Sequence, residues 1–166
     1  MTAGVTIRLA RDDELEAAGR LVADAYRTQP DMDESSGYLD KVRDARGRAG
    51  DVDVLVAVDD DGTLLGCVSY VRDHTSPYSE VERPGEAGFR MLGVAPMARG
   101  RGVGRALVDA CAERARAAGR RGVAITTEVS WTSAQRLYER AGFQRAPERD
   151  FEPVPGVRLW AYTLAL

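Results

Sequence analysis

Apolar residues recur with two different periods along this chain, and the change of period predicts a mixed α/β protein. Over residues 6–10 apolar and polar residues alternate, which predicts a short strand. Over residues 15–25 the apolar positions follow helical spacing, and Pro30 follows shortly after as a helix breaker. The acidic, glycine-interrupted stretch that continues to Gly50 leaves room for one further short helix.

The central part of the chain predicts a hairpin. Apolar runs at 53–58 and 64–71 flank an Asp-Gly pair that ends at Gly62, and Asp-Gly readily adopts the positive φ angles of hairpin turns. Residues 72–85 predict an irregular connection. Beyond it the pattern predicts a strand at 89–94, a helix from 102 to 119, a strand at 123–127, a helix that starts at a capping box over 132–135 and ends before 142, and strands at 143–146 and 157–166.

This order, β-α-(α)-β-β-β-α-β-α-β-β, contains no internal repeat and predicts one domain over residues 1–166. No apolar run approaches the roughly 20 residues that span a bilayer, so we expect no membrane segment. The chain starts without the pattern of a secretory signal, from which we expect a cytoplasmic protein. Cys67 and Cys111 lie in apolar stretches without metal-ligand spacing, so we expect buried thiols, no disulfide and no metal site.

The formal net charge of −3 and the pI near 5.3 argue against a general attraction to nucleic acid or anionic membranes. Positive charge has to act locally, and it gathers in Arg99-Gly100-Arg101-Gly102-Val103-Gly104. This segment lies between a predicted strand and a predicted helix, where glycines and free N–H groups favour close approach of an anion. We interpret it as a pyrophosphate cradle assisted by Arg99, Arg101 and Arg105; the alternative is a turn needed only for tight strand-to-helix geometry. It matches neither the dinucleotide fingerprint G-x-G-x-x-G nor a P-loop.

Two motifs resemble those of the GNAT superfamily of N-acetyltransferases. The pattern R/Q-x-x-G-x-G/A is met by Arg99, Gly102 and Gly104, after a strand of the form L-x-V-x-P met by Leu92, Val94 and Pro96. The pattern A-x-x-L-Y-x-x-x-G-F is met by Ala134, Leu137, Tyr138, Gly142 and Phe143. The likeness is close from about residue 86 to the end and rests only on element order before that.

The resemblance implies an α/β GNAT fold: a mixed, strongly twisted sheet of about six to seven strands, flanked by about four helices, with two central strands splayed to admit CoA. Acetyl-CoA would be the cosubstrate, and its pantetheine arm would pair with the backbone of Leu92, Gly93 and Val94. The Val94 N–H would polarise the thioester carbonyl. The remaining cofactor contacts implied are Arg99, Gly100, Arg101, Gly102, Val103, Gly104, Trp131 and Ala134.

Trp131 departs from the family pattern, which often has asparagine three residues before the alanine of the second motif. The indole would pack on the pantetheine or line the acceptor pocket; alternatively it covers the edge of the core.

The resemblance also implies catalytic roles for Tyr138 and Glu86. Tyr138 matches the position that protonates the CoA sulfur, and a phenol with an ordinary pKa near 10 carries its proton at neutral pH. Glu86 lies near the position from which many relatives deprotonate the amine. Glu80, Glu82 and the sole histidine, His74, are the alternatives for this base.

These residues predict direct transfer of an acetyl group to a primary amine of an unidentified small molecule or protein within a ternary complex. A CoA-binding GNAT-fold sensor without turnover, or an interaction domain that binds no CoA, are the rival interpretations. Homodimers are common among similar proteins, so we keep a homodimer as one arrangement to test.

Overall fold

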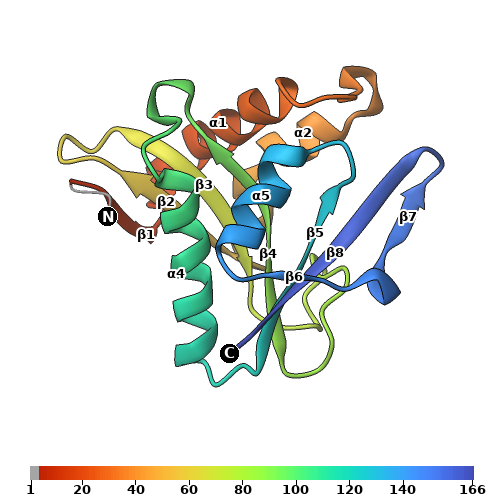
Figure 1. Cartoon of the computed structure of the whole chain (residues 1–166). Coiled ribbons are helices and arrows are strands. Elements are labelled where there is room, and N and C mark those ends of the chain that lie inside the picture. The colour runs from red at the N-terminus through yellow and green to blue at the C-terminus, as the bar shows by residue number, and fades with distance from the viewer. Residues whose placement is uncertain (1–3) are drawn as a thin grey trace.

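One twisted sheet runs through the molecule and carries helices on both faces (Figure 1). The computed structural model describes residues 4–166, which form eight strands in the order β1-β2-β3-β4-β5-β8-β6, with β7 paired to β8. The strands are β1 (Thr6–Leu9), β2 (Asp53–Val58), β3 (Leu64–Val71), β4 (Glu86–Val94), β5 (Gly122–Glu128), β6 (Gln144–Arg145), β7 (Phe151–Val154) and β8 (Val157–Ala165). The α-helices are α1 (Leu15–Arg27), α2 (Tyr38–Arg43), α3 (Ala45–Arg48), α4 (Val103–Ala117) and α5 (Thr132–Arg140).

The expected α/β architecture is confirmed, with two more elements than the sequence pattern predicted. Strand β7 is largely exposed, so it lacks the buried alternation that marks a strand in the sequence. It pairs with β8 through a turn in which Gly156 has φ +87°. Helix α3 has only four residues, too few to show a helical period.

The two faces of the sheet bury separate apolar clusters. Helices α4 and α5 cover one face, and α1 and α2 cover the other (Figure 1). The α4 face buries Leu65, Phe89, Leu107, Ile125 and Phe143 among others, and the α1 face buries Val22, Val42, Val54 and Val71 among others. Both expected thiols are buried, Cys111 in the first cluster and Cys67 in the second.

Strands β4 and β5 form a fork in the middle of the sheet. They run parallel and pair only at Glu86 with Gly122 and at Ala87 with Val123. Beyond these pairs β4 stays on β3 as far as Val94, while β5 stays on β8 as far as residue 128. Beyond these two pairs, the facing edges of β4 and β5 are not hydrogen-bonded to each other. This confirms the predicted splay.

A β-bulge interrupts β4 inside the fork. The register with β3 shifts between Cys67 and Ser69, and Met91 opposite this shift has φ 55°, a left-handed conformation that side chains with a Cβ rarely adopt. Nearby, α1 lies directly on the backbone of β4, because a Cβ added to Gly93 would lie 2.9 Å from Val22 Cα. Glycine at position 93 thus allows the helix and the strand to touch.

Candidate functional site

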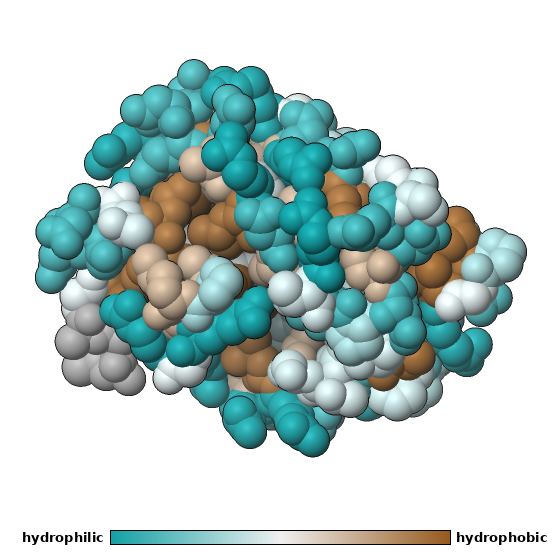
Figure 2. Space-filling model, turned by 90° about the horizontal axis from the view of Figure 1, so that it is seen from above, coloured by the Kyte–Doolittle hydropathy of each residue, from teal (hydrophilic) through white to brown (hydrophobic). Residues whose placement is uncertain are grey.

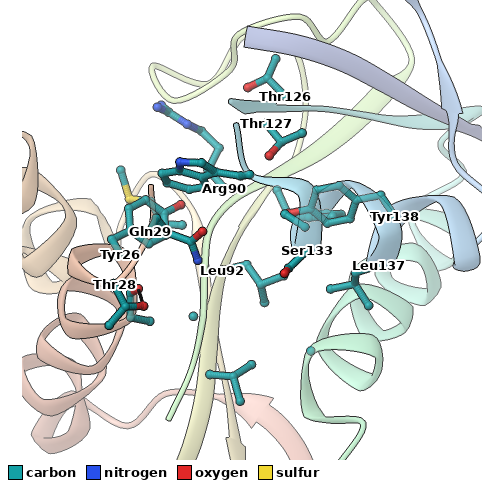
Figure 3. Close-up of a pocket in the computed structure, with 18 of the residues that line it drawn as sticks. Tyr26, Thr28, Gln29, Arg90, Leu92, Thr126, Thr127, Ser133, Leu137 and Tyr138 are labelled. Carbon is teal, nitrogen blue, oxygen red and sulfur yellow. Dashed lines mark hydrogen bonds between the residues drawn. The ribbon is translucent and has the colours of Figure 1, made fainter. Parts of the chain in front are cut away.

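The fork opens into a cavity of about 440 Å³ between the two splayed strands. Its walls come from the end of α1, from β4 and β5, and from the first turns of α5, and Figure 3 shows Tyr26 and Tyr138 entering from opposite sides. Seen from above, apolar surface lies recessed between polar residues (Figure 2). The residues that bear on the chemistry are Tyr26, Arg90, Leu92, Gly93, Val94, Thr126, Thr127, Trp131, Ala134 and Tyr138.

A second cavity, of about 480 Å³, adjoins the first at the start of α4. Val94, Arg99, Gly104 and Leu137 line both cavities, so the fork continues into the glycine-rich loop. The predicted residues Gly100, Gly102 and Val103 line this second cavity as well.

The glycine-rich loop has the geometry of an anion site. Gly100 and Gly102 have φ angles of 76° and 79°, which glycine adopts without strain. Gly102 is the N-cap of the 15-residue helix α4, and no described residue accepts a hydrogen bond from the N–H groups at 102–105. These N–H groups and the positive end of the helix dipole therefore point toward the cavity without a protein partner.

The three arginines of the loop differ in their surroundings. Arg99 lines both cavities and donates to the Thr28 hydroxyl at 3.3 Å. Arg101 is exposed and makes no ion pair with any residue in 4–166. Arg105 is already engaged, because its Nε donates to Asp109 at 2.9 Å and its Nη1 donates to the Arg140 carbonyl. Arg99 thus supplies positive charge in the cavities, whereas the uncommitted charge of Arg101 lies beside the loop and lines neither cavity.

Val94 presents its peptide groups to the fork. The Ala95 N–H donates to the Leu65 carbonyl at 2.8 Å, so residues 65 and 95 form a hydrogen-bonded pair. Hydrogen-bonded and non-hydrogen-bonded pairs alternate along an antiparallel ladder, so the next pair, Gly66 with Val94, is of the second kind. The N–H and C=O of Val94 consequently face away from β3 and toward the gap beside β5.

Tyr138 reaches the cavity from the buried face of α5. Its ring is 6% exposed and packs edge-to-face on Phe89 and Tyr162, with ring centroids 5.6 and 6.2 Å away. Burial, together with nearby Cys111, raises the pKa of Tyr138 above its ordinary value, so the phenol keeps its proton at neutral pH. None of the described residues forms a hydrogen bond with its hydroxyl, which leaves that group for a bound molecule.

Trp131 lines the cavity where the start of α5 meets the end of α1. Its indole packs edge-on against Tyr26, with ring centroids 4.9 Å apart, and its Nε1 donates to the Pro30 carbonyl at 3.3 Å. The residue thereby joins the start of α5 to the end of α1. Ala134 lines the same cavity one helical turn further on.

The start of α5 is held differently from the prediction. Trp131 is the N-cap and no side chain caps the helix, so the capping box predicted over 132–135 was wrong. The Gln135 amide donates instead to the carbonyls of Glu128 and Val129, at 3.1 and 2.9 Å. Gln135 therefore ties the loop between β5 and α5 to the first turn of α5.

Glu86 is placed outside the cavity, at the paired end of the fork. Its side chain accepts hydrogen bonds from both terminal nitrogens of Arg149, at 2.7 and 3.1 Å, and from the Arg83 N–H at 2.8 Å. Burial opposes the charged form, but these bonds and the charge of Arg121 hold the pKa of Glu86 below its ordinary value. The structure therefore does not bring Glu86 to Tyr138, and its geometry is that of an anchor for the base of β4.

Arg90 lines the cavity and forms an ion pair with Glu80, which lies just behind the cavity wall. Glu80 Oε1 lies 3.1 Å from Arg90 Nε and accepts a hydrogen bond from the Thr126 hydroxyl at 3.0 Å. Arg90 and Thr126 both line the cavity, so this carboxylate is one hydrogen bond away from its wall. His74 is exposed and lines neither of the two cavities.

Sequence reasoning missed Tyr26, Arg90, Thr126 and Thr127. Tyr26 had a signal, because it ends the apolar face of a helix four residues before Pro30. The two threonines had a weaker one, since adjacent hydroxyl residues at the end of an otherwise apolar strand are unusual choices for a buried position.

Residues 18–143 match the family model "Acetyltransferase (GNAT) family". The chain belongs to the GNAT family. The mycothiol acetyltransferase of Geodermatophilus obscurus is 32% identical over 149 residues, which are 86% of this chain and 45% of that protein. The IAA acetyltransferase of Azospirillum brasilense is 34% identical over 95 residues, 57% of each chain. This GNAT chain thus spans about half the length of the curated relatives it matches.

Solved acetyltransferase structures match the chain over nearly its whole length. A GCN5-related N-acetyltransferase from Kribbella flavida superimposes with a TM-score of 0.69 at 25% identity, covering 98% of both chains. The yncA protein of Salmonella typhimurium, solved with its cofactor acetyl-CoA, gives a TM-score of 0.69 at 20% identity and covers 98% of this chain and 94% of its own. The GNAT fold is therefore shown across both halves of the chain.

Residues 4–166 contain neither a membrane-spanning helix nor a cluster of metal-ligating side chains. None of the helices there has the length and apolar character that crossing a bilayer requires. The same residues contain no group of three or more His, Cys, Asp or Glu side chains arranged to hold a metal ion.

The placement of Glu86 in this GNAT chain predicts that Glu86→Gln lowers stability and leaves turnover nearly unchanged. Removing one partner of a buried ion pair costs about 3 kcal/mol. Because the pKa of Glu86 lies below its ordinary 4.5 in the folded state, its contribution is present at neutral pH and is lost as the pH falls below about 4.5. Urea unfolding of both proteins at pH 7 and at pH 4 should show the difference shrinking in acid. A large loss of turnover in a folded Glu86→Gln protein would contradict the anchoring role.

Proposed function

We propose that this GNAT protein transfers an acetyl group from acetyl-CoA to a primary amine by direct attack within a ternary complex. The observation that carries the proposal is the continuity of the two cavities: an anion cradle at α4 leads into a fork where Tyr138 and the peptide of Val94 meet. A diphosphate at one end and a thioester at the other suit such a shape. The yncA protein with its acetyl-CoA supports this choice of cosubstrate.

The cradle would hold the cofactor through backbone groups and two charges. The free N–H groups of Gly102, Val103 and Gly104 favour the diphosphate, and Arg99 and Arg101 add positive charge in an otherwise acidic protein. Gly100, with its positive φ angle, provides the turn that brings the backbone of the loop next to the diphosphate position. Further in, the peptide groups of Leu92 to Val94 would take the place of the missing β5 ladder and pair with the pantetheine arm.

The acyl group supplied by acetyl-CoA is an activated thioester carbonyl. The N–H of Val94 faces the fork and would stabilise negative charge that develops on the carbonyl oxygen. As the C–N bond to the amine forms and the C–S bond breaks, Tyr138 would give its proton to the sulfur and regain one from solvent.

For the amine proton we propose a base other than Glu86, because Glu86 lines neither cavity and is bonded to Arg149. Glu80 meets this need better, because its carboxylate bonds the hydroxyl of Thr126 in the cavity wall. We propose that the proton leaves the amine through this hydroxyl or a water molecule to Glu80. Arg90 would keep the carboxylate oriented through the 3.1 Å ion pair.

We place the acceptor amine at the end of the cavity lined by Trp131 and Tyr26. The residues around this end favour a cationic amine. Trp131 and Tyr26 present aromatic surface, which attracts cations through the ring face. Glu128 and Asp31 stand near this end, and burial together with the charge of Asp31 raises the pKa of Glu128. A mycothiol acetyltransferase and an IAA acetyltransferase are among the similar proteins, but neither assigns the acceptor here.

The direct test of the proposed function is an acceptor screen that records CoA-thiol release. Turnover with at least one amine supports the proposal. Acetyl-CoA binding without turnover for any amine favours the sensor, and a thermal-shift assay that shows no response to acetyl-CoA favours the interaction domain. Size-exclusion chromatography with light scattering, run alongside, tests whether the protein is a homodimer.

Gly104→Val should weaken acetyl-CoA binding by more than about tenfold, which corresponds to about 1.4 kcal/mol. A Cβ at this position lies 3.3 Å from Leu137 Cδ2 and 3.7 Å from Val94 Cγ2, so a valine fills the junction between the two cavities. Calorimetric titration measures the loss. Ala117→Val, exposed in the last turn of the same helix, is the matched control for placing a β-branched residue in α4 and should bind normally. Equal affinity in a folded Gly104→Val protein would remove the cradle from the proposal.

Tyr138→Phe should keep acetyl-CoA affinity and lose roughly 10² to 10⁴-fold in the rate of the chemical step, the usual range for a positioned general acid. Single-turnover kinetics measure this step even where product release limits kcat. Tyr162→Phe makes the same change in the neighbouring ring, which lines neither cavity, and should retain the rate. A normal single-turnover rate for Tyr138→Phe would exclude the acid role.

Glu80→Gln should lower kcat/KM at neutral pH and recover as the pH approaches the pKa of the amine, because solvent then supplies more neutral amine. The pH profile with one good acceptor is the measurement. Glu82→Gln is the control: Glu82 lines neither cavity, and its Oε2 accepts the Glu80 N–H, a bond that an amide oxygen can keep. Superimposable profiles for wild type and Glu80→Gln would rule Glu80 out, and a pH effect confined to Glu82→Gln would move the role to that residue.

A further inference from the structure

The hydroxyl of Thr127 is an unsatisfied polar group in the wall of the fork. Thr127 is 5% exposed, and its Oγ1 is buried without a hydrogen-bond partner among the described residues. Its neighbour Thr126 differs, because that hydroxyl donates to Glu80. A buried hydroxyl without a partner costs stability, so a threonine in this place calls for an explanation.

Position, burial and direction together point to a ligand. Thr127 lines the 440 Å³ cavity, and Figure 3 shows its side chain directed from β5 into the cavity on the side where Tyr138 enters from α5. Along β5 it lies beyond Val123, the last residue that pairs with β4. The edge of β4 offers peptide groups to a bound chain, and Thr127 is the polar side chain that the opposite strand contributes on the Tyr138 side.

We infer that Thr127 binds the pantetheine arm of CoA, with its Oγ1 exchanging a hydrogen bond with an amide of that arm. The inference rests on the proposed use of acetyl-CoA and adds a side-chain contact from β5 to the backbone contacts from β4. A hydroxyl suits this position because it can donate to an amide carbonyl or accept from an amide N–H. The arm would thus be held from both sides of the fork, which orients the thioester beside Tyr138.

Thr127→Val keeps the shape of the side chain and removes the hydroxyl. We expect this variant to be more stable without ligand and to bind CoA more weakly. In the absence of ligand the unpaired group is gone, so Tm should rise by about 2–6 °C. Affinity for both CoA and acetyl-CoA should fall by about 5- to 30-fold, the range for one lost hydrogen bond. Thr127→Ser keeps the hydroxyl and should restore most of the affinity without the gain in Tm.

Tyr70→Phe is the matched control. Tyr70 is 3% exposed, its hydroxyl is likewise buried without a partner, and it lines neither cavity. Removing that hydroxyl should raise Tm in the same way and leave CoA affinity unchanged. The comparison separates relief of a buried polar group from loss of a ligand contact.

Calorimetric titration and thermal unfolding of the full chain decide the outcome. Unchanged CoA affinity in Thr127→Val overturns the inference while the proposed function stands; a wild-type protein that binds no CoA removes both. A Tm that falls in Thr127→Val shows that the hydroxyl has a partner inside the protein and also overturns it. Weaker binding of acetyl-CoA alone, or a raised KM for the acceptor alone, assigns the hydroxyl to the acetyl group or to the amine and overturns the assignment to the arm.

Discussion

The limited pairing of β4 with β5 is the constraint on which the rest of the site depends. Two parallel strands that share only two residue pairs leave their remaining edges without partners, and buried peptide groups without partners are costly. The separation is maintained from both sides, since β4 is committed to β3 and β5 to β8. At the closed end, Glu86 and Arg149 hold β4 in place, so the fork opens at a fixed point.

The positions of charge follow from this fork. The α4 end carries free N–H groups and two arginines, whereas the α1 end carries Glu80, Glu128 and Asp31. An acidic protein can therefore carry a positive region and a negative region at two ends of the same pair of cavities, because interactions over a few ångströms outweigh a net charge of −3 spread over the molecule.

The parts of this site that the sequence predicted are those determined by neighbouring residues. The glycine-rich loop, the strand before it and Tyr138 on its helix all depend on short spacings, and the structure places them around connected cavities. The closed end of the fork could not be predicted in this way. Glu86 pairs with Arg149, 63 residues later in the chain, and no local pattern shows such a partner.

The contrast between local spacing and contacts to distant residues also explains the other differences between the predicted and the observed structure. The capping box over 132–135 was a correct reading of local preference, but the Gln135 side chain finds carbonyls of the preceding loop and bonds those instead. Thr127 could not be predicted from the sequence either. What distinguishes it is a buried hydroxyl without a hydrogen-bond partner, and this is known only when the positions of all its neighbours are known. Strand β7 was missed for lack of a buried face.

The contact between α1 and β4 at Gly93 makes the two elements a mechanical unit. Side-chain contacts can absorb a displacement by changing rotamer, but here a helix backbone lies against a strand backbone, with the Cβ position of residue 93 only 2.9 Å from Val22 Cα. There is no side chain between them to take up a displacement, so the spacing of α1 and β4 is set by direct backbone contact. Tyr26, one turn after Val22, and Pro30 line the cavity, so this contact also fixes how far the α1 wall of the cavity stands from β4.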